Sequence, residues 1–227
     1  MRRAVVACLL AGVVGIVGRA QTPPRLTGPT DEQITLSDIE VRRLVSLLKL
    51  EPGMTIADVG AGLGAWATRF AQWTGPSGRV YATEIDDEML AILPSVFARE
   101  RLSNVTVIKG AIASTNLPAG CCDAILTRNV YHYLTDPEAM NRSFATALKG
   151  GGRLAIVDYP TRPNSPILPG VPANRGGVGI APAIVESEVG AVLKHVTTVT
   201  NWSPEAVPDW VPKTIAPPFV VVFEKAR

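Results

Sequence analysis

The sequence contains few of the side chains that cross-link proteins or bind metal ions. Only three cysteines and two histidines occur among its 227 residues. Cys121 and Cys122 are adjacent, whereas disulfide geometry favours Cα atoms about 4.4–6.8 Å apart. We therefore expect both to be small apolar residues at the start of a strand, not a disulfide framework. Together with His132 and His195 they offer no zinc-binding spacing, so we expect no metal site.

An excess of charge of either sign is also missing. Lysine and arginine total 22 residues, aspartate and glutamate total 20, and no basic run or basic-aromatic stripe follows residue 20. Neither nucleic acid nor an anionic membrane surface is therefore an expected partner. With 47% hydrophobic and 19% charged residues, the composition is typical of a globular protein, and the length suits one full-sized domain.

The first twenty residues have the pattern of a secretory signal peptide. Arg2 and Arg3 precede an apolar run over residues 4–18, and the small-x-small sequence "GRA" ends at Ala20. We expect cleavage after Ala20 and export to the periplasm or the medium, which leaves 19 basic and 20 acidic residues, a formal net charge of −1. The apolar run is short for a membrane span, so a membrane anchor formed by an uncleaved segment 1–20 is the alternative.

Proline, threonine and glycine dominate residues 21–34, which we interpret as a linker before a domain at 35–227. A helix is expected at 37–50, with Ser37 or Asp38 as its N-cap. Strands and helices then alternate. Strands are expected at 54–59, 78–84, 104–109, 122–127 and 151–159, and helices at 65–73, at 87–100 with a kink at Pro94, and at 137–148.

These strands are near-continuous apolar runs, which favours a parallel sheet covered on both faces by helices, a doubly wound α/β domain. Residues 160–181 form a Pro/Gly-rich loop that is long enough to be functional or mobile. A helix at 182–195 and strands at 195–202 and 219–227 are expected after it.

Three glycines follow the first expected strand in "ADVGAGLGAW", at Gly60, Gly62 and Gly64. In a strand–turn–helix unit such a turn lets the backbone approach a ligand, while the helix N-terminus offers unpaired N–H groups. Asp58 ends this strand, and Glu84 ends the second strand 20 residues after Gly64, where a carboxylate can accept hydrogen bonds from ribose hydroxyls. The motif alone fits both dinucleotide and S-adenosylmethionine (SAM) sites.

Four blocks recur in a familiar order: "PGMTIADVGAGLG", "GRVYATEID", "LPAGCCDAILTRNVYHYLTDP" and "LKGGGRLAIVD". From about Lys49 to the C-terminus the chain resembles the class I SAM-dependent methyltransferases, and most of all the signal-peptide-bearing bacterial members. The resemblance implies a Rossmann-like, seven-stranded, mostly parallel sheet that ends in an antiparallel strand pair. It also implies SAM as cofactor and, as partner, a small-molecule methyl acceptor whose identity and methylated atom stay open, as does the oligomeric state.

The resemblance further implies positions for the cofactor-binding residues. Glu84 would hold the ribose diol, Ile85 would pack on adenine, and Asn129 would lie beside the methionine moiety and the reacting methyl. The methionine part of SAM would be surrounded by Asp58, Gly60, Gly62 and Gly64. The family often has an acid near the adenine amino group, whereas this chain has Ala111 and Ile112 there. We therefore expect backbone groups to recognise adenine.

A base is needed in methyl transfer only when the acceptor is protonated, and His132 is the best candidate because imidazole titrates near neutral pH. We expect Tyr131 and His132 to face the acceptor; the alternative is that His132 and its tyrosine neighbours Tyr131 and Tyr133 are structural. Asp158 and Tyr159 close the fifth strand, where they could shape the acceptor pocket, although Asp158 could instead cap the following loop.

Two other functions stay open at this point. An NAD(P)-dependent oxidoreductase would need a catalytic Tyr/Lys pair or a similar group, which we cannot place in this sequence. A non-catalytic binding protein that kept the fold is the second alternative, because SAM is made in the cytoplasm and export would separate the protein from it.

Overall fold

The structure, a computed structural model, describes residues 31–202 and 217–227. The expected signal peptide at 1–20, and residues 21–30 of the expected linker, lie outside the described residues. Helix α1 (Asp31–Leu48) begins six residues before the predicted N-cap and therefore includes the last four residues of the expected linker. Within the described ranges, no helix combines the length and apolarity that crossing a membrane requires.

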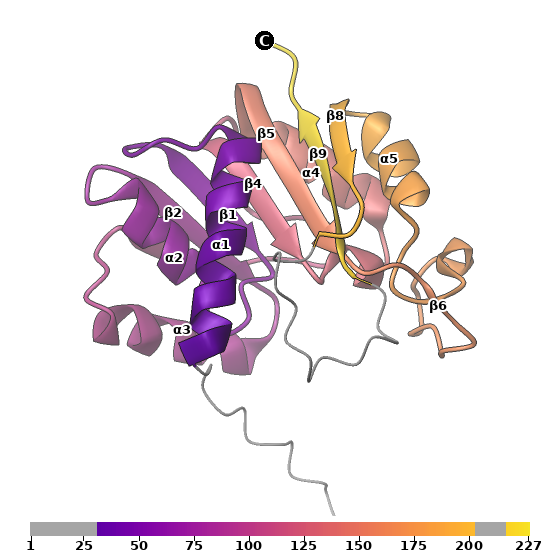
Figure 1. Cartoon of the computed structure of the whole chain (residues 1–227), viewed down its shortest axis with the longest axis horizontal. Helices are drawn as coiled ribbons and strands as arrows, with labels where there is room; N and C mark the ends of the chain where they lie inside the picture. The colour runs from indigo at the N-terminus through magenta and orange to yellow at the C-terminus, as the bar shows by residue number, and fades with distance from the viewer. Residues whose placement is uncertain (1–30, 203–216) are drawn as a thin grey trace, which may run out of the picture.

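A seven-stranded sheet forms the centre of the protein (Figure 1), in the order β3-β2-β1-β4-β5-β9-β8. All neighbouring strands from β3 to β5 are parallel, and β9 is antiparallel to both of its neighbours. This confirms the predicted fold, including the C-terminal antiparallel pair. The strands are β1 (Thr55–Val59), β2 (Arg79–Glu84), β3 (Val105–Lys109), β4 (Cys122–Arg128), β5 (Leu148–Asp158), β8 (Lys194–Val199) and β9 (Phe219–Glu224).

Helices cover both faces of the sheet. Together with α1, helices α2 (Ala65–Thr74) and α3 (Asp87–Arg99) contribute to one cluster of buried apolar side chains. The second cluster contains side chains of α4 (Pro137–Ala147) and α5 (Pro182–Gly190). A parallel sheet needs this cover on both sides, because its strands carry apolar residues on both faces.

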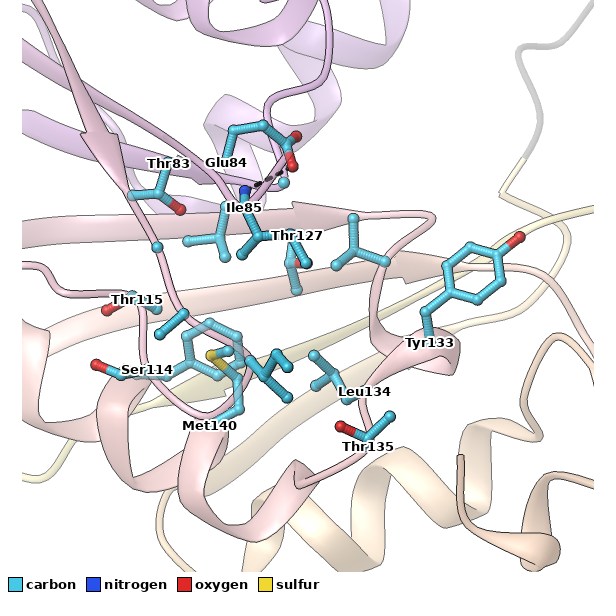
Figure 2. A pocket seen from close by; sticks show the side chains of 17 residues that line it. Thr83, Glu84, Ile85, Ser114, Thr115, Thr127, Tyr133, Leu134, Thr135 and Met140 are labelled. Carbon is cyan, nitrogen blue, oxygen red and sulfur yellow. Dashed lines mark hydrogen bonds between the residues drawn. The ribbon is translucent and has the colours of Figure 1, made fainter. Parts of the chain in front are cut away.

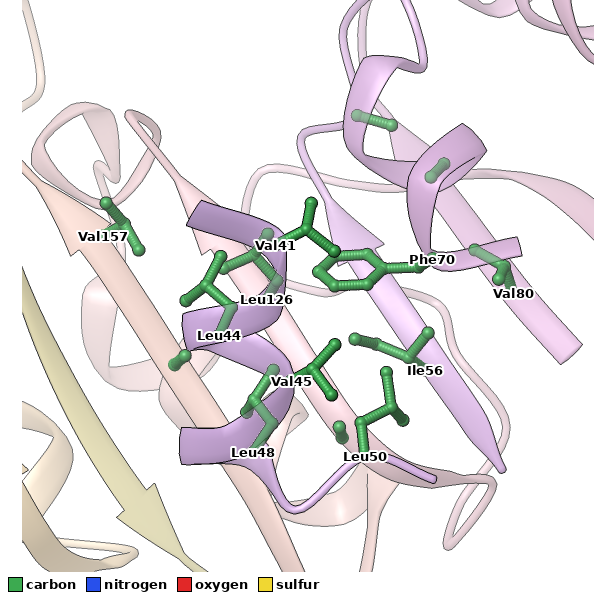
Figure 3. Close-up of a cluster of buried hydrophobic side chains, with 14 of the residues drawn as sticks. Val41, Leu44, Val45, Leu48, Leu50, Ile56, Phe70, Val80, Leu126 and Val157 are labelled. Carbon is green, nitrogen blue, oxygen red and sulfur yellow. The ribbon is translucent and has the colours of Figure 1, made fainter. Parts of the chain in front are cut away.

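Helix α1 shows how the sequence produces this packing. Its apolar residues recur at spacings of three and four and so line one face of the helix, at Val41, Leu44, Val45 and Leu48. Figure 3 shows this face directed toward Ile56 of β1, Leu126 of β4 and Val157 of β5. All seven side chains are buried, so α1 is anchored to the central strands that carry the site.

Four local features refine the predicted pattern. Asp86 caps α3, because its side chain accepts hydrogen bonds from the N–H groups of Glu88 and Met89. Helix α5 ends at Gly190, five residues earlier than predicted, consistent with the low helix propensity of glycine. Strand β5 begins at Leu148, so the Gly150–Gly152 run lies inside it, where the pairing with β4 shifts register. Cys122 is free and buried at the first position of β4, as expected.

The long segment after β5 is structured. It contains the short antiparallel pair β6 (Arg162–Pro163) and β7 (Gly177–Val178), and between them the 3₁₀ helix η2 (Ala173–Arg175). A second 3₁₀ helix, η1 (Tyr131–Tyr133), follows β4. Both segments lie at the carboxyl end of the parallel strands, where the site residues gather.

Candidate active site

The strand order reverses between β1 and β4, and ligands in open α/β sheets bind outside the carboxyl ends of the strands at such a point. The glycine turn between β1 and α2 lies there. A Cβ atom at Gly60 would lie 2.4 Å from Cγ2 of Val130, and one at Gly64 would lie 2.9 Å from Cδ2 of Leu93, so packing alone excludes side chains at both. A Cβ at Gly62 would meet nothing within 4 Å. Of the three glycines, Gly62 is therefore the one at which a ligand can approach open backbone.

Glu84, at the end of β2, holds the glycine turn in place. One carboxylate oxygen accepts the N–H of Gly62 at 2.9 Å, and the other accepts the N–H of Ile85 at 2.7 Å. The oxygen that accepts from Ile85 also accepts the N–H of Asp86 at 3.3 Å, whereas the oxygen that accepts from Gly62 keeps a second lone pair and can accept a hydrogen bond from a ligand hydroxyl. The structure thus brings Gly62 and Glu84 together, as the predicted cofactor site requires.

A cavity of about 420 Å³ opens beside Glu84, and we call it the larger cavity. Figure 2 shows Glu84 and Ile85 on one side of it and Met140 of α4 on the opposite side. Ile85 and Ile112 are unusually exposed for their size, at 56% and 63%, and both line this cavity. The other lining residues are Val59, Gly60, Thr83, Gly110, Ala111, Ser114, Thr115, Thr127, Val130, Tyr133, Leu134, Thr135 and Phe144.

The hydrogen bonds of this cavity limit how adenine could be recognised. The N–H of Ala111 already donates to the carbonyl of Ser114 at 2.7 Å, so that amide is not available to a base. The buried hydroxyl oxygen of Thr127, by contrast, has no hydrogen-bond partner among the described residues. A ligand in the cavity could provide the partner that this buried hydroxyl lacks.

Asp58 lies beneath the glycine turn and is 2% exposed. One oxygen accepts the N–H of Ala67, in the first turn of α2, at 2.9 Å. Burial raises the pKa of this carboxyl from 3.8 to about 7, although the Ala67 hydrogen bond opposes the shift; repulsion from Glu84 adds to it and the positive charge of Arg128 opposes it. With a pKa near 7, this carboxyl is partly protonated at neutral pH, and a positively charged neighbour would favour its ionised form.

Arg128, which the sequence reasoning did not single out, connects α1 to this edge of the sheet. Its guanidinium donates to both oxygens of Glu40, at 3.2 and 3.3 Å, and Trp202 donates its indole N–H to the same carboxylate at 2.9 Å. The sequence feature that could have identified Arg128 is its place as the last residue of β4, directly before Asn129. The cluster fixes α1 above the carboxyl end of β4.

A second cavity of about 240 Å³, the smaller cavity, lies beside the residues that follow β4 and β5. It is lined by Asn129, His132, Tyr133, Tyr159, Arg162, Val178 and Gly179. Tyr133 lines both cavities, and Val130 of the larger cavity is the chain neighbour of Asn129. The two cavities therefore adjoin.

His132 and Asp158 form a buried pair in the wall of the smaller cavity. Nδ1 of His132 lies 2.7 Å from Oδ1 of Asp158, and the backbone N–H of His132 donates to Oδ2 at 3.1 Å. The N–H of Tyr159 donates to Oδ1 at 2.8 Å. A carboxylate beside Nδ1 fixes the tautomer with the proton on Nδ1, which leaves the lone pair on Nε2. Nε2 is buried and has no partner among the described residues.

Asn129 has a constrained backbone and an unpaired side chain. Its φ is +58°, its N–H donates to the carbonyl of Val157 at 2.8 Å, and its buried Oδ1 has no partner in the described chain. A non-glycine residue in the left-handed region at the end of a strand is uncommon and clusters at functional sites. Asn129 lines the smaller cavity, and its chain neighbour Val130 lines the larger one; its expected place beside the methionine part of SAM stays a prediction.

Tyr131 lies elsewhere than expected. It is fully buried, lines neither cavity, and belongs to the apolar cluster under α4 and α5. Its hydroxyl donates to Glu188 at 3.0 Å and accepts the amide N–H of Asn141 at 2.8 Å. Alternate residues of η1 point in different directions, so Tyr133, 46% exposed with its ring 3.8 Å from that of His132, occupies the position that we expected for Tyr131.

The segment after β5 provides one wall of the smaller cavity and is firmly anchored. Arg175 is fully buried and donates to both oxygens of Glu188 on α5, at 2.6 and 3.0 Å. Its carbonyl accepts the hydroxyl of Thr161 at 2.9 Å. At Gly179 a Cβ would lie 2.6 Å from the carbonyl oxygen of Pro160, so the chain can pack this closely only with glycine. The sequence reasoning identified the segment but none of these contacts.

The carboxyl edge therefore holds two adjoining cavities, one beside Gly62 and Glu84 and one beside His132 and Asn129. Within the described ranges, no group of three His, Cys, Asp or Glu side chains could hold a metal ion. The arrangement can bind an extended ligand in the larger cavity and place a proton acceptor beside a second ligand.

Comparisons with known proteins find similar methyltransferases. A family model described as a methyltransferase domain matches residues 56–152. The ubiquinone/menaquinone biosynthesis C-methyltransferase UbiE of Ectopseudomonas mendocina is 28% identical over 133 residues, which are 56% of this chain and 50% of that protein. The chain thus spans about half the length of the curated relatives that it matches.

Two solved structures share the fold. A SAM-dependent methyltransferase from Aquifex aeolicus superposes with a TM-score of 0.63 at 22% identity, over 83% of this chain and 92% of that one. Geranyl diphosphate C-methyltransferase from Streptomyces coelicolor, solved with Mg²⁺, geranyl diphosphate and S-adenosyl-L-homocysteine, gives 0.68 at 13% identity, over 86% and 80%. The chain therefore has the Rossmann-like fold of the SAM-dependent methyltransferases, and its residues 56–152 match the methyltransferase-domain family.

Proposed function

We propose that this protein is a class I SAM-dependent methyltransferase that acts on a small-molecule acceptor. The observation that carries the proposal is the pairing of two adjoining cavities. Gly60 and Glu84, whose carboxylate accepts the N–H of Gly62, line the larger one, and His132, whose Nε2 is unpaired among the described residues, lines the smaller one. A transferase for two ligands needs such neighbouring compartments.

The residues of the larger cavity fit SAM. Glu84 has lone pairs for the ribose hydroxyls, Ile85 and Ile112 offer apolar faces for the adenine ring, and the orphaned hydroxyl of Thr127 lacks a partner that a ligand can provide. The positive charge of the ammonium group of SAM would favour the ionised form of Asp58, which lies beneath the glycine turn. When bound, SAM supplies a methyl group on a sulfonium sulfur, and its transfer forms a bond to the acceptor atom and leaves a neutral thioether.

The residues of the smaller cavity fit the acceptor side. His132, held through Nδ1 by Asp158, takes the acceptor's proton on Nε2, and the resulting imidazolium is stabilised by that carboxylate. Tyr133 lines both cavities and Asn129 lines the smaller one next to Val130 of the larger one, so they can align the acceptor with the methyl group. Alignment is the main contribution of an enzyme to such a displacement.

Isothermal titration of the protein with SAM, with S-adenosylhomocysteine and with NADH tests this proposal. We expect binding of the first two and not of NADH. Glu84→Ala should weaken binding at least about tenfold, because ribose hydroxyls lose their acceptor. Binding of NADH alone would instead support the oxidoreductase, and SAM binding without methyl transfer to any compound would support the non-catalytic alternative.

Gly62 allows a matched control for the glycine turn. Gly62 and Gly120 have similar φ values, +52° and +60°, and a Cβ at either would meet nothing within 4 Å. Gly62→Val and Gly120→Val therefore carry a similar backbone strain. Only Gly62→Val should weaken the binding of S-adenosylhomocysteine, by about tenfold or more, because only its side chain would fill space beside Glu84. Equal affinities in the two variants would contradict the assignment.

A further inference from the structure

Arg162 is the one arginine or lysine among the described residues that line the smaller cavity. It lies on β6, where its backbone pairs with Val178, another lining residue. Among the described residues, its guanidinium has no hydrogen-bond or ion-pair partner. The positive charge is therefore available to a ligand in this cavity.

Apart from Val178 and Gly179, the other described lining residues are aromatic or polar and define the ligand further. Tyr133 and Tyr159 offer ring faces, while Nε2 of His132 and Oδ1 of Asn129 are buried without a partner. Both orphaned atoms can accept a hydrogen bond, given the tautomer that Asp158 imposes on His132. The volume of about 240 Å³ is below the range of drug-sized sites, about 300–1,000 Å³, and suits a compound with a single ring.

From these features we propose that the methyl acceptor is a small aromatic acid: its carboxylate is bound by Arg162 and its hydroxyl is directed to His132. Guanidinium binds carboxylate in a planar, two-pronged geometry that neither lysine nor a neutral group reproduces. The wall that carries Arg162 is preorganised, because Arg175 anchors the segment to α5 and Gly179 packs against Pro160. That this acid is a methyl acceptor rests on the proposed function. Whether the smaller cavity binds an acid can be tested independently.

The test compares the three monohydroxybenzoates with the corresponding hydroxybenzamides, titrated into the protein both alone and in the presence of excess S-adenosylhomocysteine. The amides have nearly the same shape and lack the charge. We expect at least one of the acids to bind about tenfold or more tightly than its amide, because the charged hydrogen bonds are lost in the amide. Equal binding of every acid and its amide would overturn the inference.

Three variants connect the effect to Arg162. Arg162→Gln should remove the preference for the acid, and Arg162→Lys should restore part of it by restoring charge without the two-pronged geometry. Arg99→Gln is the control, because Arg99 is an arginine of α3 that is 72% exposed and lines neither cavity. Arg162 is exposed, so we expect the melting temperatures of all three variants to match the parent. A preference for acids that persists in Arg162→Gln would overturn the assignment.

Failure of this inference and failure of the proposed function give different results. If the protein transfers methyl groups only to neutral compounds, the acid preference is wrong and the methyltransferase stands. If Arg162-dependent binding of acids occurs without SAM binding, the recognition of acids stands and the proposed transferase is wrong.

Discussion

The two cavities at the carboxyl edge are built by different means. In the larger cavity Thr115 and Glu84 use their polar groups inside the protein, in the 2.9 Å contact between the hydroxyls of Thr115 and Ser143 and in the bonds of Glu84, and the hydroxyl of Thr127 is buried without a partner among the described residues. The smaller cavity instead leaves His132 Nε2 and Asn129 Oδ1 buried and unpaired. The first cavity is lined mostly by apolar residues and glycine, and the second presents more unpaired polar atoms. Binding of the cofactor and chemistry on the acceptor should therefore be separable by mutation.

The largest difference between effects on turnover and effects on cofactor binding is expected from His132→Ala. Loss of a general base lowers turnover by about 10²–10⁴-fold, while the affinity for S-adenosylhomocysteine should change little because His132 lines only the smaller cavity. Methyl uptake is measured with an acceptor found by screening phenols, thiols, amines and arsenite. His195→Ala is the matched control, since His195 lies on β8 and lines neither cavity.

Two results would contradict the catalytic assignment of His132. Full turnover in His132→Ala at normal stability would show that no proton is taken at Nε2. A lower melting temperature with parallel losses of cofactor binding and turnover would show that His132 is mainly structural.

The second prediction concerns the wall of the smaller cavity. Arg175→Met leaves the Glu188 carboxylate, which is 20% exposed, without its guanidinium partner. Breaking a buried ion pair in this way costs about 3 kcal/mol or more, so we expect a melting temperature lower by roughly 6–12 °C. Below that temperature, acceptor affinity should fall more than cofactor affinity, because the wall belongs to the smaller cavity only.

Two controls separate charge from packing in this test. Arg142→Met removes an exposed partner of Glu138 and should change stability by less than about 0.5 kcal/mol. Arg175→Met combined with Glu188→Gln removes the unpaired charge and should recover part of the loss. An Arg175→Met protein as stable as the parent would show that the pair does not anchor the wall.

The difference between the cavities also explains what the sequence could predict. The larger cavity is built by local pattern: a strand, a glycine turn and an acid at the end of the next strand, so Gly62 and Glu84 were found together. The smaller cavity is built by contacts distant in sequence, such as His132 with Asp158 and Arg175 with Glu188. The sequence does not indicate whether Tyr131 or Tyr133 of the 3₁₀ helix η1 faces the cavity. The prediction for Tyr131 was wrong for this reason.

The fold was predictable for the same reason that the larger cavity was. Apolar runs and glycine or proline breaks specify strands and turns locally, and the parallel order follows from burial on both faces. Element ends depend on tertiary contacts, as at the start of β5, where Leu148 pairs with Cys122 of β4 three residues before the predicted first residue.

The smallest expected effect concerns Asp58 and pH. Because burial places the pKa of Asp58 at about 7 in the folded protein, the carboxyl is mostly neutral at pH 6 and mostly ionised at pH 8. A ligand ammonium group favours the ionised form. We therefore expect the affinity for S-adenosylhomocysteine to rise about tenfold between pH 6 and pH 8, measured by calorimetry in buffers of equal ionic strength.

The same carboxyl should affect ligand-free stability in the opposite direction. Its folded pKa lies above its unfolded value, so its contribution to the free energy of unfolding is complete below about pH 4 and is lost as the pH rises through 7. Asp58→Asn keeps the shape and removes the titration, and should flatten both profiles. If affinity rises equally with pH in Asp58→Asn, a group other than Asp58 causes the rise. Titratable groups would then affect ligand binding only through residues other than Asp58. If only the parent protein shows the rise, the ionised carboxylate of Asp58 interacts with the positive charge of the ligand.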